Sequence, residues 1–389
     1  MNSPLPTNSN LEPRQSKKLS FKLDFQAYTL IIALILIALI FGFFTNGEFL
    51  SSRNLSNLFT QMSVVAVLAI GMTLVIVSGH IDLSIGSLVG LTGGIAAILQ
   101  VWFGMSTGVV VLAAIVVGAI AGLWQGWWVA YRHVPAFIVT LGGMLIFRGI
   151  LIGISKGQTV APLNDSFKHI GNNYIPYTWG YIIAAVSVVL LFVITARTRA
   201  KRQSMGLSVP STLVDYGKMT VYSFFTLFIT YMLNRYLGIP IAMLIAVSFA
   251  GLFLFVSLKT SFGRYVYAIG GNVEAAALSG INIKRNVLYV FILMGALVGL
   301  AGVLLTSRLN AATVSAGNML ELDVIAACVI GGTSLMGGKG KIVGAIIGAL
   351  IMASIDNGMS MMNIETFWQY IVKGLILIFA VWLDISNKK

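Results

Sequence analysis

Residue types that could perform catalysis or bind a metal ion are few in this sequence. The three histidines, His80, His133 and His169, are scattered along the chain without the short intervals that bring metal ligands together. No cluster of polar residues suits an enzyme active site. We therefore predict no catalytic residue and no metal site, which argues against an enzyme.

A glycine-rich run at residues 337–341, Gly-Gly-Lys-Gly-Lys, has only a superficial likeness to a phosphate-binding loop. Such a loop needs a glycine five residues before a second glycine, and Lys followed by Ser or Thr directly after it. Here Thr333 occupies the first position, and Gly340 follows Lys339. The chain is therefore expected to bind neither ATP nor another cofactor, so an ATP-driven process would need a separate nucleotide-binding polypeptide.

Six charged residues interrupt or border long apolar stretches, where charge is costly if the stretches lie in lipid. A carrier driven by protons or sodium would use such a carboxylate at mid-depth, and Asp82 is the residue that tests this alternative. Most of the six lie near the ends of apolar stretches, so we interpret them as structural or gating groups. They are Asp82, Arg148, Glu321, Asp323, Asp356 and Lys373.

A passage for a neutral, hydroxyl-rich solute needs amides, hydroxyls and aromatic faces more than paired charges. The tentative residues of such a passage are Asp82, Trp124, Gln125, Asn357 and Gln369. Tryptophans also gather at the interface between a membrane and water. For Trp127 and Trp128 this interfacial role is an equally good explanation.

The composition shows which solvent these residues face. Apolar residues make up 58% of the 389 residues and charged residues only 10%, against about 45–50% and about 25% in soluble domains. So few charges could not cover the apolar surface of a soluble fold, so we expect lipid around the chain. The net charge of +13 is then explained by basic loops beside apolar spans rather than by binding of nucleic acid.

Stretches of about 20 apolar residues predict membrane-spanning helices, and we find twelve candidates. They cover residues 28–44, 62–79, 85–103, 108–131, 134–154, 180–196, 219–237, 240–258, 286–305, 322–335, 342–355 and 367–383. The tenth and eleventh are short, so either could be broken or re-entrant. Most of the 25 Lys and Arg residues fall on one side if both chain ends lie in the cytoplasm, which favours an N-in, C-in topology.

The connection at residues 260–285 is the most informative of the cytoplasmic segments. It mixes glycine turns with a short predicted helix at residues 272–278, which Asn272 would cap and Glu274 would favour near its N-terminus. Gly280 suits a left-handed end of that helix. A short helix on a cytoplasmic loop is typical of a docking element for a partner, although an ordinary loop helix would have the same pattern.

The segment Gly118-Ala119-Ile120, followed by Gly122, has an echo at Gly344-Ala345-Ile346, followed by Gly348. The predicted topology makes the two copies run in opposite directions. Inverted repeats are common in transporters, which place their pathway at the repeat interface. Coincidence in a sequence rich in Gly, Ala and Ile is the alternative.

Several long motifs in fixed order resemble bacterial sugar permeases of ATP-binding-cassette importers, the group for ribose, xylose, arabinose and galactosides. They lie at residues 71–91, 135–150, 262–285, 321–345 and 367–382. Within the group the likeness is greatest to the D-xylose type, because a basic loop at residues 197–218 and two additional spans precede the motif at 262–285. The resemblance thus implies an all-α membrane protein with a ten-segment core plus two extra segments, in the bacterial inner membrane.

The same resemblance implies a non-catalytic subunit that forms a homodimer around one pathway for a monosaccharide. A separate ATPase would bind the ATP, and a periplasmic sugar-binding protein would dock on the outer loops. The ATPase-coupling residues implied by the motif are Gly270, Gly271, Asn272, Glu274, Ala275, Ser279 and Gly280. Many relatives have a smaller residue in place of Gln125, which weakens its assignment to sugar binding.

The resulting domain plan has one transmembrane permease domain at residues 28–384, with the coupling loop at 259–286. Short cytoplasmic tails at 1–27 and 385–389 flank it. An ion-coupled sugar carrier, a permease for another pentose or hexose, and an amino-acid permease of the same broad superfamily are the alternatives. No residue chemistry in the sequence distinguishes a pentose from a hexose.

Overall fold

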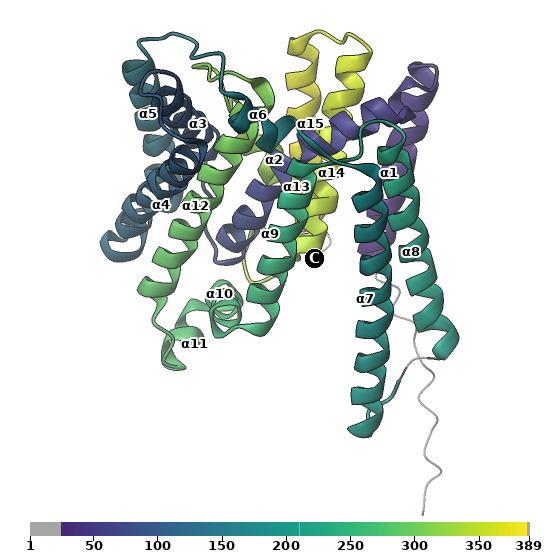
Figure 1. The fold of residues 1–389 in the computed structure, drawn as a ribbon. Coiled ribbons are helices and arrows are strands. Elements are labelled where there is room, and N and C mark those ends of the chain that lie inside the picture. The colour runs from purple at the N-terminus through teal and green to yellow at the C-terminus, as the bar shows by residue number, and fades with distance from the viewer. Residues whose placement is uncertain (1–24, 210, 387–389) are drawn as a thin grey trace, which may run out of the picture.

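A computed structural model describes residues 25–209 and 211–386, so the predicted tails lie almost entirely outside the described residues. The described chain is helical, as predicted, apart from one pair of two-residue strands (Figure 1). The helices are α1 (Phe25–Phe44), η1 (Glu48–Leu50), α2 (Ser52–Val77), α3 (Ile85–Val101), α4 (Thr107–Arg132), α5 (Ala136–Ser155), α6 (Asp165–Asn172), α7 (Tyr177–Ser204), α8 (Thr212–Asn234), α9 (Ile241–Lys259), α10 (Ser261–Gly271), α11 (Val273–Leu278), α12 (Ile283–Leu309), α13 (Leu320–Ile330), α14 (Ile342–Met361) and α15 (Thr366–Ser386). The strands are β1 (Tyr174–Ile175) and β2 (Ile239–Pro240).

Eight helices of the described chain are long and apolar enough to cross a membrane: α2, α4, α5, α7, α9, α12, α14 and α15. The segment Thr29–Phe44 of α1 and the whole of α3 are shorter apolar helices. The chain is therefore a polytopic membrane protein. Its helices run side by side, with α10 and α11 at one end of the bundle and α6 at the other (Figure 1).

Helices α2 and α12 form the centre of the bundle. Within their most apolar stretches, 94% of the residues of α2 and 72% of those of α12 are buried, against 11% in α7 and none in α15. Helix α2 is apolar on all sides along residues 64–72, and a helix of that kind needs protein or lipid around its whole circumference. The core therefore surrounds α2, whereas α7 and α15 turn most of their surface to lipid.

Glycines allow α4 and α12 to cross at backbone contact. A Cβ atom at Gly118 would overlap the carbonyl oxygen of Gly295, and one at Gly122 would overlap that of Phe291. Small residues permit this close approach between membrane helices, which gains packing contacts that lipid cannot offer. Gly344 and Gly348 serve the same purpose between α14 and α13.

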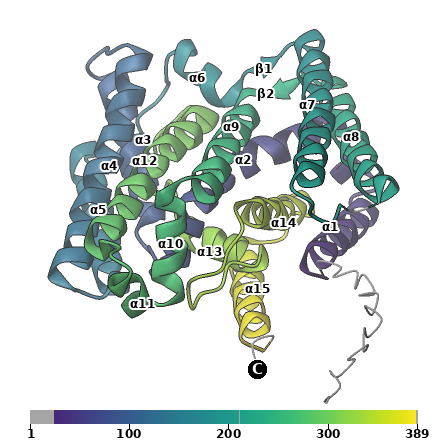
Figure 2. The ribbon, with the colours of Figure 1, turned by 90° about the horizontal axis from the view of Figure 1, so that it is seen from below.

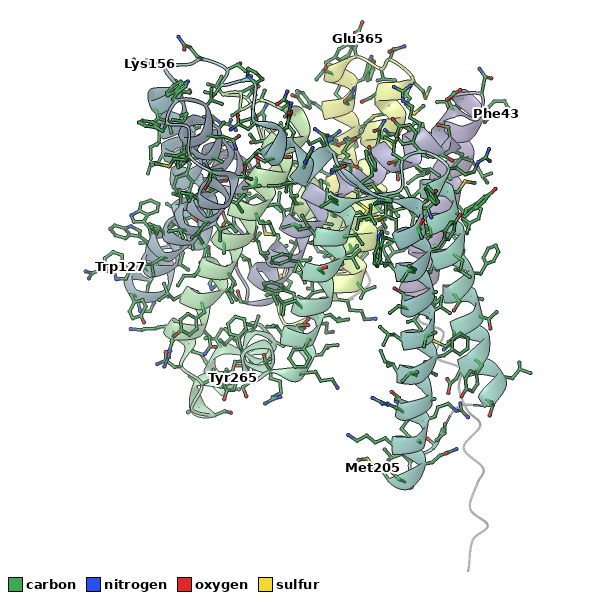
Figure 3. All side chains as sticks on the ribbon, in the orientation of Figure 1. Phe43, Trp127, Lys156, Met205, Tyr265 and Glu365 are labelled. Atoms are coloured by element: carbon green, nitrogen blue, oxygen red, sulfur yellow. The ribbon has the colours of Figure 1, made fainter. Side chains whose placement is uncertain are left out.

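The two Gly-Ala-Ile segments therefore both lie at close helix crossings. Helix α4 descends to its last turns, where Trp127 lies, whereas α14 rises to the turn before Glu365 at the upper end of the bundle (Figure 3). The two segments thus run in opposite directions, as the predicted repeat requires. An inverted repeat of the whole fold stays a prediction.

Helices α7 and α8 form a hairpin at the edge of the bundle (Figure 2). Its two ends are held together by antiparallel pairing of β1 with β2, in which Tyr174 lies opposite Pro240 and Ile175 opposite Ile239. Helix α7 packs on α8, and α8 packs on α2. Long exposed apolar side chains such as Val189, Phe224 and Phe225 cover the outer faces of the hairpin.

Of the two segments predicted to be short, only one is. Helix α13 has 11 residues, too few to span a bilayer, and the loop of residues 331–341 follows it. Helix α14 has 20 residues and continues beyond residue 355, where the predicted segment ended. The polar residues there remain helical because Asp356 pairs with Lys373 and Asn357 with Asn54.

Candidate functional site

The predicted coupling residues lie on α10, α11 and the turn that follows, at the lower end of the bundle (Figures 1 and 3). Asn272 caps α11, because its Oδ1 accepts a hydrogen bond of 2.9 Å from the Ala275 amide. Gly280 has a φ of +80° and ends the helix, as predicted. All seven predicted residues therefore lie in one short helix–turn unit.

Helix α11 presents apolar side chains outward. Leu278 is 91% exposed and Val273 52% exposed, whereas Ala276 is buried against the rest of the protein. Exposed apolar groups on a short, well-capped helix are typical of a surface that another protein covers.

Gly270 fixes this unit to the transmembrane core. A Cβ atom at this position would overlap the carbonyl oxygen of Val77, the last residue of α2, and would lie 2.6 Å from the amide nitrogen of Gly338. The Gly338 amide itself donates a 2.9 Å hydrogen bond to the Val77 carbonyl. The end of α10, the end of α2 and the loop before α14 thus meet at backbone contact. At Gly271, by contrast, the space that a Cβ atom would occupy is open.

The glycine-rich run at residues 337–341 is the third partner in this contact. Gly337 and Gly338 have φ values of +82° and +71°, which side chains with a Cβ rarely adopt. The hydroxyl of Tyr267 on α10 donates a 2.7 Å hydrogen bond to the carbonyl of Gly340. Burial raises the pKa of Tyr267, so its hydroxyl remains a donor at physiological pH.

Replacement of Tyr267 by phenylalanine tests this connection. The variant removes one hydroxyl and leaves the Gly340 carbonyl without that donor, which costs about 1–3 kcal/mol where the group is buried. We expect the variant to fold. If a separate ATPase drives the chain, as the resemblance implies, the variant should bind that ATPase but transport a few-fold less solute per ATP hydrolysed. Parallel measurement of uptake and ATP hydrolysis in proteoliposomes gives this ratio, and an unchanged ratio would show that the hydrogen bond has no part in coupling.

Asp82, Gln125 and Ser84 form a buried polar network between α3 and α4. Asp82 Oδ1 accepts hydrogen bonds from the Ser84 amide at 2.9 Å and the Ser84 hydroxyl at 2.6 Å. Gln125 Nε2 donates to the same hydroxyl at 2.7 Å, and Gln125 Oε1 has no partner among the described residues. The three side chains are at most 2% exposed. Ser84 was not among the predicted residues; its signal is its place two residues after Asp82 and directly before α3.

An open cleft of about 460 Å³ adjoins this network. Its walls are the α2–α3 connection, with His80 and Ile81, and the turn between α4 and α5, with His133. Thr140 on α5 lies 3.4 Å from the Ile81 carbonyl. Val129 and His133, which line the cleft, lie in the last turns of α4 that also carry Trp127 (Figure 3). Trp124, 39% exposed, packs edge-on against Phe147 beside Gln125.

The other two predicted pathway residues lie elsewhere. The side-chain amides of Asn357 and Asn54 exchange hydrogen bonds of 2.8 and 3.0 Å, which join α14 to α2. Gln369 donates a 2.8 Å bond to the carbonyl of Ile364 at the turn before α15. The structure therefore brings Asp82, Trp124 and Gln125 together but places Asn357 and Gln369 at separate structural contacts.

Lys373 of α15 joins two carboxylates from other helices. Its Nζ lies 2.9 Å from Asp323 Oδ2 on α13 and 2.9 Å from Asp356 Oδ2 on α14. The Oδ1 atoms of both aspartates are buried and have no partner in the described chain. A cavity of about 80 Å³ lies beside them and is also lined by Gln61 and Arg308. This volume has room for several waters.

Arg148, another of the six charged residues singled out in the sequence, also makes contacts between distant segments. Its guanidinium donates hydrogen bonds to the backbone carbonyls of Val314 and Ala316.

Comparisons with known proteins agree with this architecture. A family model described as branched-chain amino acid transport system / permease component matches residues 54–381. The xylose transport system permease protein XylH of Escherichia coli (strain K12) is 49% identical over 367 residues, which cover 94% of this chain and 93% of that protein. XylH of Haemophilus influenzae is 51% identical over 366 residues, covering 94% and 98%.

The ribose import permease protein RbsC of Escherichia coli (strain K12) is 37% identical over 361 residues, which cover 93% of each chain. No solved structure matches the chain at a significant level. The resemblance to sugar permeases seen in the motifs is thus confirmed over almost the full length. The chain is a non-catalytic transport protein and belongs to the family of branched-chain amino acid transport system permease components.

Proposed function

We propose that the chain is the membrane permease subunit of an ATP-driven importer that carries D-xylose into a bacterial cell. The observation that carries this proposal is the identity of about half of all residues with two xylose permeases, which extends over 94% of the chain. The ribose permease is similar over the same length but is only 37% identical. The difference favours xylose over ribose as the solute.

A topology with twelve crossings and both chain ends in the cytoplasm fits this role. The eight long apolar helices would be joined by α1, α3, α8 and a twelfth crossing that α13 makes together with the loop of residues 331–341. Basic residues are frequent at the end of the bundle that holds α10 and α11: Lys339 and Lys341 flank Gly340, which the Tyr267 hydroxyl joins to α10, and Lys259, Arg264 and Lys284 lie in or next to α10 and α11 along the chain. Basic loops mark the cytoplasmic side.

The ATPase partner would bind at α10 and α11, through Gly270–Gly280 and the exposed side chains of Val273 and Leu278. The support for this assignment is the contact of this unit with the ends of α2 and of the loop before α14, because a displacement there moves the helices of the core. A two-state membrane domain driven by such a displacement would open alternately to the two sides.

The solute would pass beside Asp82, Trp124 and Gln125, next to the cleft at the α2–α3 connection. Trp124 is the exposed member and offers an aromatic face to a sugar ring, whereas the buried Asp82 and Gln125 would hold α3 and α4 in register. Because Trp124 faces away from the core, a second copy of the chain would complete the passage. A periplasmic sugar-binding protein would deliver the sugar at the opposite end.

The test is reconstitution of the chain with its ATPase and its sugar-binding protein in proteoliposomes. We expect xylose to stimulate ATP hydrolysis and uptake more than ribose, arabinose, galactose or glucose does. Stimulation by another sugar alone would replace xylose as the solute. Uptake by the isolated chain driven by a proton or sodium gradient would show a secondary carrier instead.

A further inference from the structure

Helix α7 is longer than a bilayer requires. Its 28 residues extend over about 42 Å at 1.5 Å per residue, whereas the hydrocarbon core of a bilayer is about 30 Å thick. Roughly the last eight residues must therefore lie among or beyond the lipid headgroups. The apolar part of α7 ends at Thr195, and the sequence that follows, Ala-Arg-Thr-Arg-Ala-Lys-Arg-Gln-Ser, carries the excess length.

The projecting end has exposed positive charge. We use the term basic hairpin end for the exposed cations of this region, Arg197, Lys201, Arg202 and Lys218. None of these four forms an ion pair within the part of the chain that the structure describes. The nearby carboxylate of Asp215 is already occupied by Arg199, which also donates to Thr212 at 3.0 Å. The basic hairpin end is therefore not neutralised by the protein.

Apolar side chains accompany these charges at the tip of the hairpin. Met205 is 59% exposed, Leu207 57% and Leu213 85%. Figure 3 shows Met205 at the lowest point of the described chain, beyond Tyr265 of α10. The four basic residues therefore lie between the apolar span and the tip, at the depth of the headgroup phosphates.

Little of the described protein packs against the outer faces of the hairpin. Helix α7 has its main contact with α8 alone, and α8 joins the bundle through α2. Seen from below, the hairpin lies at the edge opposite α4, α5 and α11 (Figure 2). A partner that binds at α10 and α11 therefore covers a different part of the lower face, whereas headgroups of the adjacent leaflet surround the basic hairpin end.

We propose that the basic hairpin end is a binding surface for anionic phospholipid, which it recognises by the headgroup phosphate and net negative charge. The assignment of this end to the cytoplasmic leaflet rests on the proposed topology. Anionic lipid attracts each juxtamembrane Lys or Arg enough to change affinity about fivefold. Four such residues on one hairpin therefore bind anionic lipid much more strongly than neutral lipid. Arg199 is not counted among them because it forms an ion pair with Asp215.

The test uses the full-length permease in nanodiscs of phosphatidylcholine mixed with phosphatidylglycerol, whose anionic headgroup supplies the negative surface potential that attracts basic residues. The lipid retained after extraction is counted by native mass spectrometry. We expect the variant R197Q/K201Q/R202Q/K218Q to retain at least about tenfold less phosphatidylglycerol than the parent, with phosphatidylcholine unchanged. Salt should reduce retention in the parent, because exposed charges are screened.

The matched control is K259Q/R264Q/K284Q/K339Q, which removes the same charge from exposed residues around α10 on the same face. This control should retain phosphatidylglycerol like the parent. Equal loss in both variants, or no loss in the first, would overturn the proposal. Unchanged lipid retention with loss of ATPase co-purification would assign the surface to the ATPase instead. The readout needs neither sugar nor ATPase, so it is independent of whether xylose is the solute.

Discussion

Replacing Gly270 with alanine is expected to abolish ATP-driven uptake while the neighbouring replacement of Gly271 leaves it intact. A methyl group at residue 270 would overlap the Val77 carbonyl oxygen and crowd the Gly338 amide, and both are backbone atoms that cannot rotate away. Alanine at this site therefore forces α10 away from α2 and from the loop before α14. Overpacking of this kind costs about 1–3 kcal/mol or more in stability. The displaced α10 also loses its backbone contact with α2 and with the loop before α14.

Gly271 provides the control because no atom lies within 4 Å of its added Cβ. Alanine favours the helical backbone there, so stability should change by no more than about 0.5 kcal/mol. Uptake in proteoliposomes and thermal unfolding of the purified permease measure both variants. If Gly270→Ala and Gly271→Ala had equal uptake and equal stability, close contact at Gly270 would not be needed.

Replacing Lys373 with methionine should produce the largest loss of stability among single changes in α15. The side chain of methionine has a similar length, but it leaves Asp323 and Asp356 without their shared cation, and both carboxylates are largely buried. Removing one partner of a buried ion pair typically costs about 3–5 kcal/mol, since a buried charge remains uncompensated. Because α15 packs mainly on α13, we expect it to detach first on heating.

Two further variants identify the cause of that loss. The triple variant K373M/D323N/D356N removes the uncompensated charge and should recover most of the stability, since neutral groups replace a buried ionic cluster at little cost. The exposed pair of Lys168 and Asp165 on α6 gives the comparison, because K168M should have no measurable effect. Thermal unfolding in detergent measures all three, and a full loss in the triple variant would assign the effect to packing of the lysine chain.

Local patterns predicted those features that depend on neighbours in the sequence. Asn272 and Gly280 marked the beginning and end of α11 because capping and left-handed turns involve only a few adjacent residues. Runs of about 20 apolar residues located the long helices because lipid imposes their length. Three of the five predicted pathway residues, Asp82, Trp124 and Gln125, lie near one another in the structure, and their role in transport stays a prediction.

Contacts between segments that are distant in the sequence could not be predicted from local patterns. Lys373 meets Asp323 and Asp356 only because three helices converge, and nothing within 15 residues of any one of them reveals the others. Asn357 and Gln369 looked available for a solute, yet their amides serve helix contacts. The glycines at 337–341, whose pattern had a superficial likeness to a nucleotide loop, are required by the close approach to Gly270 and Val77, two segments more than 60 residues away in sequence.

The pairing of β1 with β2 places the two boundaries of the α7–α8 insertion about 5 Å apart, the spacing of paired strands. Because these two boundaries are adjacent, the chain before β1 could be linked directly to the chain after β2. The α7–α8 pair could therefore be inserted or deleted without moving the helices on either side. Because the inserted pair crosses the bilayer once in each direction, the sidedness of everything downstream, including α10 and α11, is the same with or without it. The presence of the α7–α8 pair therefore leaves the orientation of α10 and α11 unchanged.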